Sequence, residues 1–310
     1  MDNLLTKETF IVESEDSGKR IDLIFTHLIP SFTRALCEKE TTSFFIDGQK
    51  VKKSKKVKEG DEITIEYKIE EETEEIIPTN IPLSILYEDE DILVINKDQG
   101  LVVHPGSGNK DHTLVHALLF RYEQAFKNEF SDEETKLRPG IVHRLDKETS
   151  GVMVVAKNRA SYLHLMNQFK QRLTSKYYIV LVKGKVQLRR GSITTNIVRD
   201  EKSRQRFTIT TKVGKGKEAR TDYRVLKYYQ GYTLLRVEIF TGRTHQIRVH
   251  LTSIGHPVIG DTVYSRVPKD SPMMLHALSL EFTHPTSEQT LKCVAPLPTR
   301  FKEYIASHTK

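Results

Sequence analysis

Four stretches of the chain place apolar residues at the three- to four-residue spacing of a helix that buries one face. Pro30 follows the first stretch, and Gly255 with Pro257 follows the last, so both have a defined end. A shorter helical piece is expected over residues 33–40. The four amphipathic helices are predicted at residues 20–28, 112–122, 159–172 and 244–254.

Other apolar stretches are short and lack helical spacing, which is typical of strands. Residues 91–97 and 152–156 are almost continuously apolar, so we expect these two strands in the middle of a sheet. Near the start of the chain, Asp47-Gly48 is a hairpin turn signal. The remaining predicted strands cover residues 44–46, 63–67, 176–182 and 233–240.

The predicted strands outnumber the helices and do not alternate with them regularly, which disfavours a doubly wound parallel sheet. We predict a larger α+β domain with a mixed, mostly antiparallel β-sheet flanked by helices and loops, preceded by a small α/β domain. A length of 310 residues fits two domains. Residues 70–82 are acidic and then hold two prolines, which is typical of a linker. The predicted domains therefore span residues 10–69 and 83–306.

Charge is divided unevenly between the two parts. Residues 1–75 hold 12 Lys and Arg against 18 Asp and Glu, a net charge of −6, whereas residues 76–310 hold 36 against 23, a net charge of +13. Residues 183–220 alone carry 12 basic against 3 acidic residues, a net charge of +9. Such a local excess attracts polyanions, although a solvated, mobile basic loop is the alternative. The nucleic-acid contacts predicted in this segment are Arg189, Arg190, Arg204 and Arg206.

Several classes of protein are disfavoured by what the sequence lacks. Two cysteines, Cys37 and Cys293, are too few for a disulfide scaffold or a four-cysteine metal site. The first residues do not form a secretory signal, and no apolar run approaches the length of a membrane span. We expect a cytoplasmic protein without membrane contact. Paired histidines such as His112 and His116 have no carboxylate pattern beside them, so we expect no metal.

The first domain resembles the S-four RNA-binding domain, named for a ribosomal small-subunit protein. The family's pattern of helix, second helix, hairpin and closing strand is matched by Arg20-Ile21-Asp22, Thr33-Arg34, Asp47-Gly48 and Gly60-Asp61. The resemblance implies RNA binding on one basic face. The residues expected on that face are Arg34, Lys52, Lys53, Lys55 and Lys56.

Asp146 lies in a polar segment just before an apolar strand. An isolated aspartate there would be interpreted as a turn residue that accepts hydrogen bonds from nearby N–H groups. However, the segment from His143 to Gly151, His-Arg-Leu-Asp-Lys-Glu-Thr-Ser-Gly, resembles the signature of the RluA-type pseudouridine synthases at all seven specified positions. Further matching blocks follow the family's order, and the resemblance spans residues 85–300. These blocks are Asn96-Lys97, 100–105, Lys176-Tyr177-Tyr178, 242–251, 255–257 and Gly260-Asp261.

The resemblance implies an enzyme that converts uridine in RNA to pseudouridine without a cofactor. Asp146 would be the nucleophile or base, and attack at C1′, attack at C6 and removal of the C2′ proton all stay open. Arg248 would pair with the carboxylate. Tyr178 would stack on the uracil and could assist loss of the C5 proton. Arg144, together with His143, would fill the gap left by an extruded base, and Arg243 would contact RNA.

Members of the family with an S-four-like front domain typically modify ribosomal RNA of the large subunit, so we expect that RNA as substrate of a monomeric enzyme. The main alternative is a catalytically silent RNA-binding or ribosome-assembly protein on the same fold. A hydrolase that uses Ser150, His143 and Asp146 is disfavoured, because these residues lie too close together in one loop and no glycine elbow flanks the serine.

Overall fold

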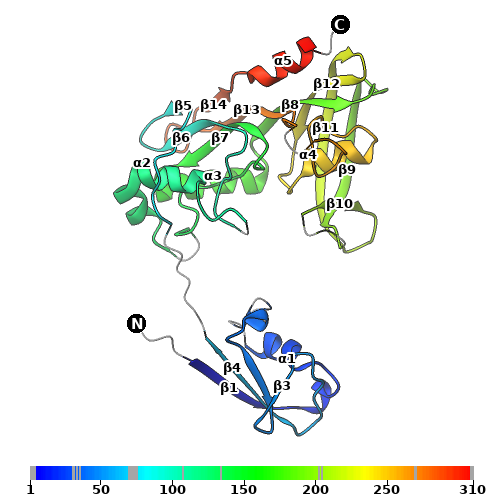
Figure 1. The fold of residues 1–310 in the computed structure, drawn as a ribbon. Coiled ribbons are helices and arrows are strands. Elements are labelled where there is room, and N and C mark those ends of the chain that lie inside the picture. The colour runs from blue at the N-terminus through cyan, green and yellow to red at the C-terminus, as the bar shows by residue number, and fades with distance from the viewer. Residues whose placement is uncertain are drawn as a thin grey trace. The chain divides into compact units, whose positions relative to one another are not determined.

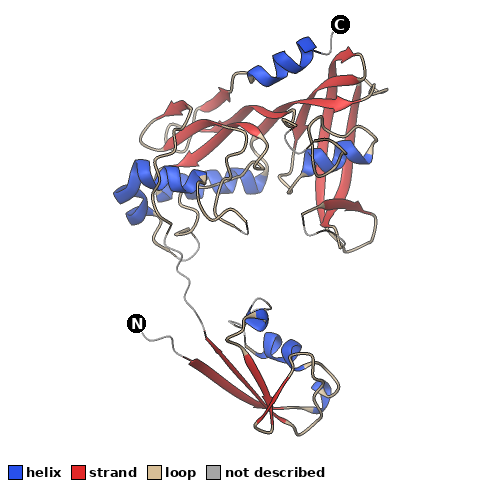
Figure 2. Cartoon of the chain, in the orientation of Figure 1, coloured by secondary structure: helices blue, strands red, loops and turns tan. Residues whose placement is uncertain are grey.

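The computed structural model describes residues 5–29, 32, 34, 36–68, 76–106, 108–132, 135–201, 203, 205–268 and 271–307. The chain divides into two compact units, Met1–Glu75 and Ile76–Lys310. Each unit has its own sheet and its own apolar core (Figures 1 and 2).

The described part of the first unit is a four-stranded antiparallel sheet, in the order β1-β4-β2-β3, with one α-helix packed against it. Helix α1 (Ile21–Leu28) buries Ile21, Ile24 and Phe25, as its apolar spacing predicts. Asp47 and Gly48 both have positive φ in the tight turn between β2 and β3. The helical piece expected over 33–40 lies partly outside the described residues, and its described part is a 3₁₀ turn at Leu36–Glu38. The strands are β1 (Leu5–Ile11), β2 (Ser43–Ile46), β3 (Gln49–Val51) and β4 (Glu62–Lys68).

The second unit is built on one large sheet, which has ten strands within the described residues. Its order is β10-β9-β11-β12-β8-β13-β7-β6-β5, and β14 pairs with β13 off this path. Every described pairing is antiparallel except that of β13 with β7. The predicted α+β class with a mixed, mostly antiparallel sheet is therefore confirmed. The strands are β5 (Ile85–Glu88), β6 (Ile92–Lys97), β7 (Ser150–Ala156), β8 (Ser175–Lys183), β9 (Arg190–Arg199), β10 (Phe207–Thr210), β11 (Lys217–Tyr229), β12 (Tyr232–Ile239), β13 (Leu275–Thr283) and β14 (Thr290–Val294).

Helices pack against this sheet at separate places (Figure 1). Helices α2 (Leu114–Glu129) and α3 (Arg159–Gln171) lie beside the β5–β7 end, whereas α4 (Gln246–Ser253) packs against β10 and β11. The C-terminal helix α5 (Thr299–Ser307) buries Phe301 against residues of β8 and β12. Within the described residues, no helix is both long and apolar enough to cross a membrane.

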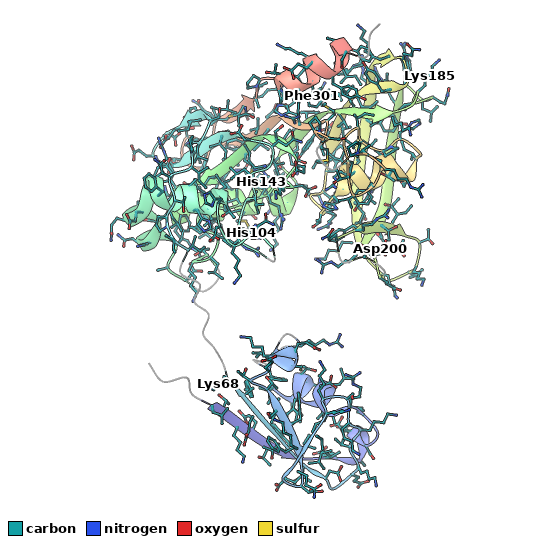
Figure 3. The ribbon with its side chains drawn as sticks, in the orientation of Figure 1. Lys68, His104, His143, Lys185, Asp200 and Phe301 are labelled. Carbon is teal, nitrogen blue, oxygen red and sulfur yellow. The ribbon has the colours of Figure 1, made fainter. Side chains whose placement is uncertain are left out.

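Half of the residues in the basic segment 183–220 lie in strands. Strand β9 pairs with β10 to form a hairpin, and β11 pairs with β9 from its first residue, Lys217. The alternative of a mobile basic loop is therefore wrong for the half of the segment that is paired in the sheet. Its exposed side chains lie on a folded surface, and Figure 3 labels Asp200 at the tip of the hairpin.

Residues 76–82, which the sequence places in the linker, belong to the second unit. Ile76 packs against its core, and the backbone N–H of Thr79 donates to the carbonyl of His116 on α2. The acidic half of that stretch, residues 70–75, lies outside the described residues.

Candidate active site

Asp146 lies on the loop between Gly140 and β7. Val142 and Leu145 of this loop point into the core, whereas the Asp146 side chain remains 19% exposed. The backbone N–H of Thr149 donates to the Asp146 carbonyl in a turn. Behind the loop, the buried Lys97 ammonium donates to the carbonyl of Lys147 at 3.2 Å. The loop is thus fixed from its apolar side, and the carboxylate faces the opposite way, into a pocket.

The end of the same loop is fixed by a close approach between two strands. Gly151 opposes Ala277 where β7 and β13 run parallel, and it has a φ of 119°. A Cβ at this position would lie 2.2 Å from the Ala277 carbonyl oxygen. Ala277 in turn opposes Tyr178 on β8. Because residue 151 is glycine, β7 can pack closely against β13, and only this one strand separates the end of the Asp146 loop from Tyr178.

Ser150, next to this glycine, is held from two distant parts of the chain. Its hydroxyl lies 2.9 Å from Nδ1 of the buried His276, and Arg300 on α5 donates to it at 2.6 Å. Burial and the charge of Arg300 lower the pKa of His276 to about 4, so the ring is neutral at neutral pH. The serine is therefore a structural anchor of the loop, and it does not form a triad with His143 and Asp146.

Arg248 on α4 connects two carboxylates. It donates from Nη1 to Asp146 Oδ2 at 3.3 Å, from Nε to Asp261 Oδ2 at 2.7 Å and from Nη2 to Asp261 Oδ1 at 2.9 Å. Burial alone would lower its pKa, but the hydrogen bonds and charges of Asp261 and Asp146 raise the pKa of Arg248 above its usual value. The guanidinium therefore stays cationic and stabilises the Asp146 carboxylate.

His245 precedes α4 in a left-handed conformation, with a φ of 57°. Its Nε2 lies 3.9 Å from Asp146 Oδ2, and its Nδ1 is hydrogen-bonded to the Tyr264 hydroxyl at 3.0 Å. Burial lowers the pKa of His245 despite the nearby carboxylate. A neutral imidazole therefore lies beside Asp146 at neutral pH.

Tyr178 contributes an aromatic wall to the same pocket. The residue is 7% exposed, and burial together with the Asp146 charge raises the pKa of its hydroxyl well above the usual value. The phenol therefore stays protonated, which favours stacking over proton removal by a phenolate. The pocket has a volume of about 500 Å³, measured out to its open mouth, and Arg144 and Arg243 also line it.

Arg144 and His143 are neighbours but occupy different environments. Arg144 is exposed at the mouth of the pocket. The His143 ring is stacked on Phe169, with ring centroids 4.6 Å apart, and its Nε2 accepts a hydrogen bond from the backbone N–H of Val154 (Figure 3 labels His143). These contacts favour a packing role for His143, whereas Arg144 is free to approach RNA. Their part in base extrusion stays a prediction.

The basic residues predicted in segment 183–220 are spread over the second unit. Arg206 lies over the Tyr264 ring, 5.4 Å from its centroid, and so reaches the surroundings of His245. Arg189 and Arg190 are exposed at the start of β9, and Arg204 lies outside the described residues.

The basic residues predicted in the first unit are mostly exposed. The backbone carbonyls of Lys53 and Lys55 accept hydrogen bonds from the first residues of α1, and the Lys53 ammonium is paired with Glu38. The side chains of Arg34, Lys52, Lys55 and Lys56 are exposed.

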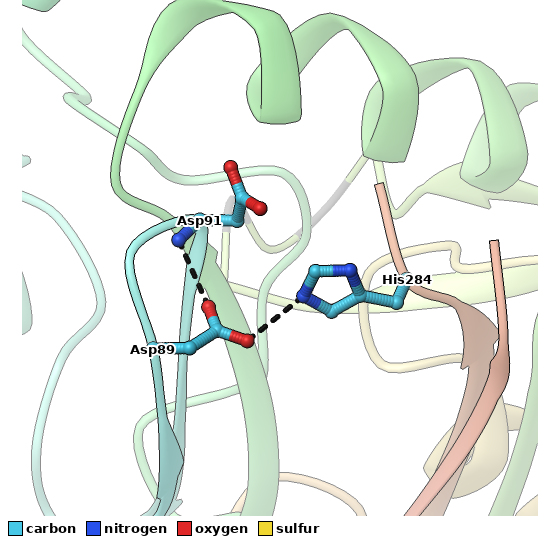
Figure 4. Close-up of side chains that lie close together, drawn as sticks. All are labelled: Asp89, Asp91 and His284. Atoms are coloured by element: carbon cyan, nitrogen blue, oxygen red, sulfur yellow. Dashed lines mark hydrogen bonds and ion pairs between the residues drawn. The ribbon is translucent and has the colours of Figure 1, made fainter. Parts of the chain in front are cut away.

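One group of described residues has the chemistry of a metal site: Asp89, Asp91 and His284, whose ligand atoms lie within 4.8 Å of one another (Figure 4). Asp89 accepts hydrogen bonds from His284 Nε2 at 2.8 Å and from Tyr87. His284 Nδ1 accepts from the backbone N–H of Ser287, so the ring proton is on Nε2. Asp91 is likewise bonded, to Asn158 and Ser161. These side chains thus already make hydrogen bonds, and the bond between Asp89 and His284 connects the β5–β6 turn with the segment after β13.

The five residues that the sequence motifs predict for the site all line the same pocket: Asp146, Tyr178, Arg248, Arg144 and Arg243. No role is predicted from the sequence for His245 or Asp261, although both lie within the quoted blocks. The one sequence feature that points to Asp261 is the Gly260-Asp261 pair, thirteen residues after Arg248.

Comparison with known proteins agrees with this geometry. Residues 91–253 match the family described as RNA pseudouridylate synthase. An uncharacterized RNA pseudouridine synthase of Aquifex aeolicus is 45% identical and covers 94% of each chain. A ribosomal large subunit pseudouridine synthase D of Borreliella burgdorferi is 38% identical over 98% of this chain and 93% of its own. Among solved structures, human RNA pseudouridylate synthase domain containing 1 is 31% identical, with a TM-score of 0.55, over 70% of this chain and 84% of its own.

The mixed sheet and the carboxylate–arginine pocket at its centre are therefore those of an RNA-modifying enzyme. The chain belongs to the RNA pseudouridylate synthase family, and its activity is the isomerisation of uridine in RNA to pseudouridine.

Proposed function

We propose that this enzyme acts on one or more uridines of large-subunit ribosomal RNA, and that Asp146 is the carboxylate that acts at the glycosidic centre. Relatives of 37–39% identity that cover more than 90% of this chain are named ribosomal large subunit pseudouridine synthase D, which supports the choice of RNA. The observation that carries the catalytic assignment is the 3.3 Å hydrogen bond from Arg248 to Asp146 at the base of the pocket.

The reaction breaks the bond between N1 of uracil and C1′ of ribose, turns the base, and joins C5 to C1′. The C5 proton leaves and N1 takes up a proton, so nothing is oxidised or reduced. The protein must supply a charged group at the sugar, a surface that holds the detached base and shelter from water.

Asp146 meets the first requirement because its carboxylate is mostly shielded from water and is stabilised by a cation that cannot lose its proton at neutral pH. A carboxylate in such a site can attack carbon or accept a proton. Tyr178 meets the second requirement with a ring face. Its protonated hydroxyl can donate a hydrogen bond, and its raised pKa disfavours action as a base.

Extrusion of the base requires a group to replace it in the RNA. Arg144 is exposed at the pocket mouth, and its planar guanidinium can stack on bases and bind phosphate. We infer that Arg144 occupies the space that the uridine leaves.

The decisive experiment is release of tritium from RNA that carries [5-³H]uridine, because this proton leaves only when C5 is joined to C1′. Purified enzyme should release tritium from an unmodified large-subunit rRNA transcript. Chemical mapping of pseudouridine in ribosomal RNA from cells with and without the gene should show the loss of specific sites. Loss of sites in transfer RNA alone would contradict the proposed substrate.

We also infer that the first unit binds RNA through its basic face, formed by Arg34, Lys52, Lys53, Lys55 and Lys56. Replacement of these five residues by Gln should weaken binding to rRNA and leave turnover on a short substrate unchanged. Equal binding by the two proteins, measured at one salt concentration, would contradict this assignment.

A further inference from the structure

A second hollow adjoins the catalytic pocket. It shares part of its lining with the pocket, including Arg144, Tyr178 and Arg243, so the two are continuous. Its volume is about 1140 Å³ measured out to open solvent, against about 500 Å³ for the catalytic pocket. We call it the cationic groove, because the lining contains five basic side chains and, among the described residues, no carboxylate. These side chains are Arg144, Lys170, Arg172, Lys176 and Arg243.

Lys176 is the innermost of these cations. It is 9% exposed, and its ammonium lies 5.6 Å from the centroid of the Phe169 ring. Within the part of the chain that the structure describes, the Lys176 ammonium has neither a hydrogen-bond acceptor nor a carboxylate partner. Burial and the charge of Arg172 lower its pKa below the usual value. A buried cation that faces another cation is costly for a folded protein, and such a cost is typical of a site that awaits an anion.

The rim of the groove differs from its interior. Arg172 is exposed and lies 3.7 Å from the Glu218 carboxylate, and Arg243 donates from Nε to the Glu218 backbone carbonyl. These contacts orient the two guanidinium groups without neutralising Lys176. An anion that enters the groove would therefore meet several cations at the rim, of which Arg172 is partly paired, and the unpaired Lys176 ammonium at the bottom.

The position of Lys176 relates the groove to the reaction. Lys176 and Tyr178 lie two residues apart on β8, so their side chains are on the same face of the sheet, about 7 Å apart along the strand. A base stacked on Tyr178 thus places its own ribose and phosphate within reach of the groove. A metal ion would be repelled by this lining, whereas a phosphate would be attracted.

We propose that the cationic groove binds a backbone phosphate of the RNA strand beside the extruded uridine, with Lys176 as its inner ligand. This inference rests on the pseudouridine synthase activity and does not depend on which RNA is modified. Phosphate binding at this point would hold the sugar of the target nucleotide while its base is detached.

The test measures binding of a short fluorescein-labelled oligouridylate by anisotropy at several salt concentrations between about 50 and 200 mM. The variants are Lys176→Met, which keeps the aliphatic stem, and Lys176→Arg, which keeps the charge. Lys227→Met is the matched control, because Lys227 makes a similar contact, 5.1 Å from the Tyr229 ring centroid, at an exposed position outside the groove. Arg172→Gln at the exposed rim provides a second groove variant should Lys176→Met not fold.

One lost phosphate contact lowers the slope of log K against log salt by about 0.7 for a single strand. Lys176→Met should show this decrease together with about tenfold weaker binding at low salt, whereas Lys176→Arg and Lys227→Met should match the wild type. Lys176→Met should also melt at an unchanged or higher temperature, because a buried unpaired charge has been removed. A wild-type slope for Lys176→Met, or an equal decrease for Lys227→Met, would overturn the proposal. Because the probe is not ribosomal RNA, neither result depends on the proposed substrate.

Discussion

Arg248 binds Asp261 more closely than it binds Asp146. Two of its nitrogen atoms contact Asp261 at 2.7 and 2.9 Å, and one contacts Asp146 at 3.3 Å. The Asp261 side chain is fully buried and also accepts hydrogen bonds from the backbone N–H groups of Val263 and Tyr264. Asp261 thus fixes the plane of the guanidinium, and the guanidinium then presents its remaining edge to the catalytic carboxylate.

Asp261→Ala should therefore lower the rate of tritium release about 10- to 100-fold and destabilise the fold by about 3–5 kcal/mol, because Arg248 loses its buried partner. Oligouridylate binding by the folded protein should persist. Asp222→Ala is the matched control, since Asp222 has a similar two-point contact with Arg220 on the surface, where such a pair contributes about 0–1 kcal/mol. Urea unfolding and turnover at saturating RNA measure both effects, and similar losses in the two variants would contradict the assignment.

Asp146→Asn should fold normally and bind RNA at least as well as the wild type, but its tritium release should fall below detection. The amide keeps the shape of the side chain and is neither a useful nucleophile nor a base. Glu148→Gln, an exposed carboxylate two residues away on the same loop, should retain wild-type turnover. Release of tritium by Asp146→Asn at near the wild-type rate would remove Asp146 from the mechanism.

Tyr178→Phe keeps the stacking ring and should retain RNA binding with a severe loss of rate. Because burial and Asp146 raise the pKa of the phenol above its usual value of 10.0, the wild-type rate should show no step from phenol ionisation below pH 10. The rate of tritium release, followed from neutral to alkaline pH, measures this. A rise in rate with an apparent pKa below 10 that disappears in Tyr178→Phe would instead identify the tyrosine as a base.

His143 makes stability depend on pH. Burial, aided by the charge of Lys176, lowers its folded-state pKa from 6.5 to about 3, so below pH 6.5 the unfolded chain takes up a proton that the folded chain does not. The folded state therefore loses about 1.4 kcal/mol per pH unit from this residue as the pH falls from about 6 to about 4. His143→Gln retains an acceptor for the Val154 N–H and cannot titrate. Urea unfolding at several pH values should give a shallower acid slope for the variant, and parallel slopes would contradict the prediction.

Gly151→Ala should destabilise the second unit by about 1–3 kcal/mol or more, because the added Cβ would clash with the Ala277 carbonyl at a backbone conformation that alanine rarely adopts. Turnover should fall as well, since the substitution separates β7 from β13 beside the Asp146 loop. Gly106→Ala is the control, because an added Cβ there meets no atom within 4 Å. Equal melting temperatures for the two variants would show that the strands can move apart without cost.

The elements that were predicted from sequence are those with a strong local pattern. The stripe of α3 and the continuous apolar residues of β6 and β7 correspond to the observed elements within a few residues. Strands β9 and β11 were missed because they are half exposed and rich in Thr, Lys and Arg, so neither apolar alternation nor a continuous run marks them. Their strand conformation depends on pairing with neighbouring strands, which no local pattern shows: β9 pairs with β10 and β11, and β11 also pairs with β12.

The same distinction between local sequence pattern and tertiary context applies to the candidate site. Asp146, Tyr178 and Arg248 were found through the motifs that contain them. Lys176, which carries the proposed phosphate site, lies in one of those motifs, but its lack of a partner is a property of the surrounding fold and cannot be read from neighbouring residues.

The hydrogen bond from Arg300 to Ser150 joins residues that are 150 positions apart. A ribosome that adds roughly 5–20 residues per second needs about 8–30 s to synthesise that stretch. Throughout this interval the nascent chain contains Asp146, and it gains Tyr178, Arg248 and Asp261 in turn, but it still lacks Arg300 of α5, which anchors the loop. The catalytic loop is therefore anchored only after every catalytic side chain has been translated, and a chain that stops before residue 300 would carry those side chains on an unanchored loop.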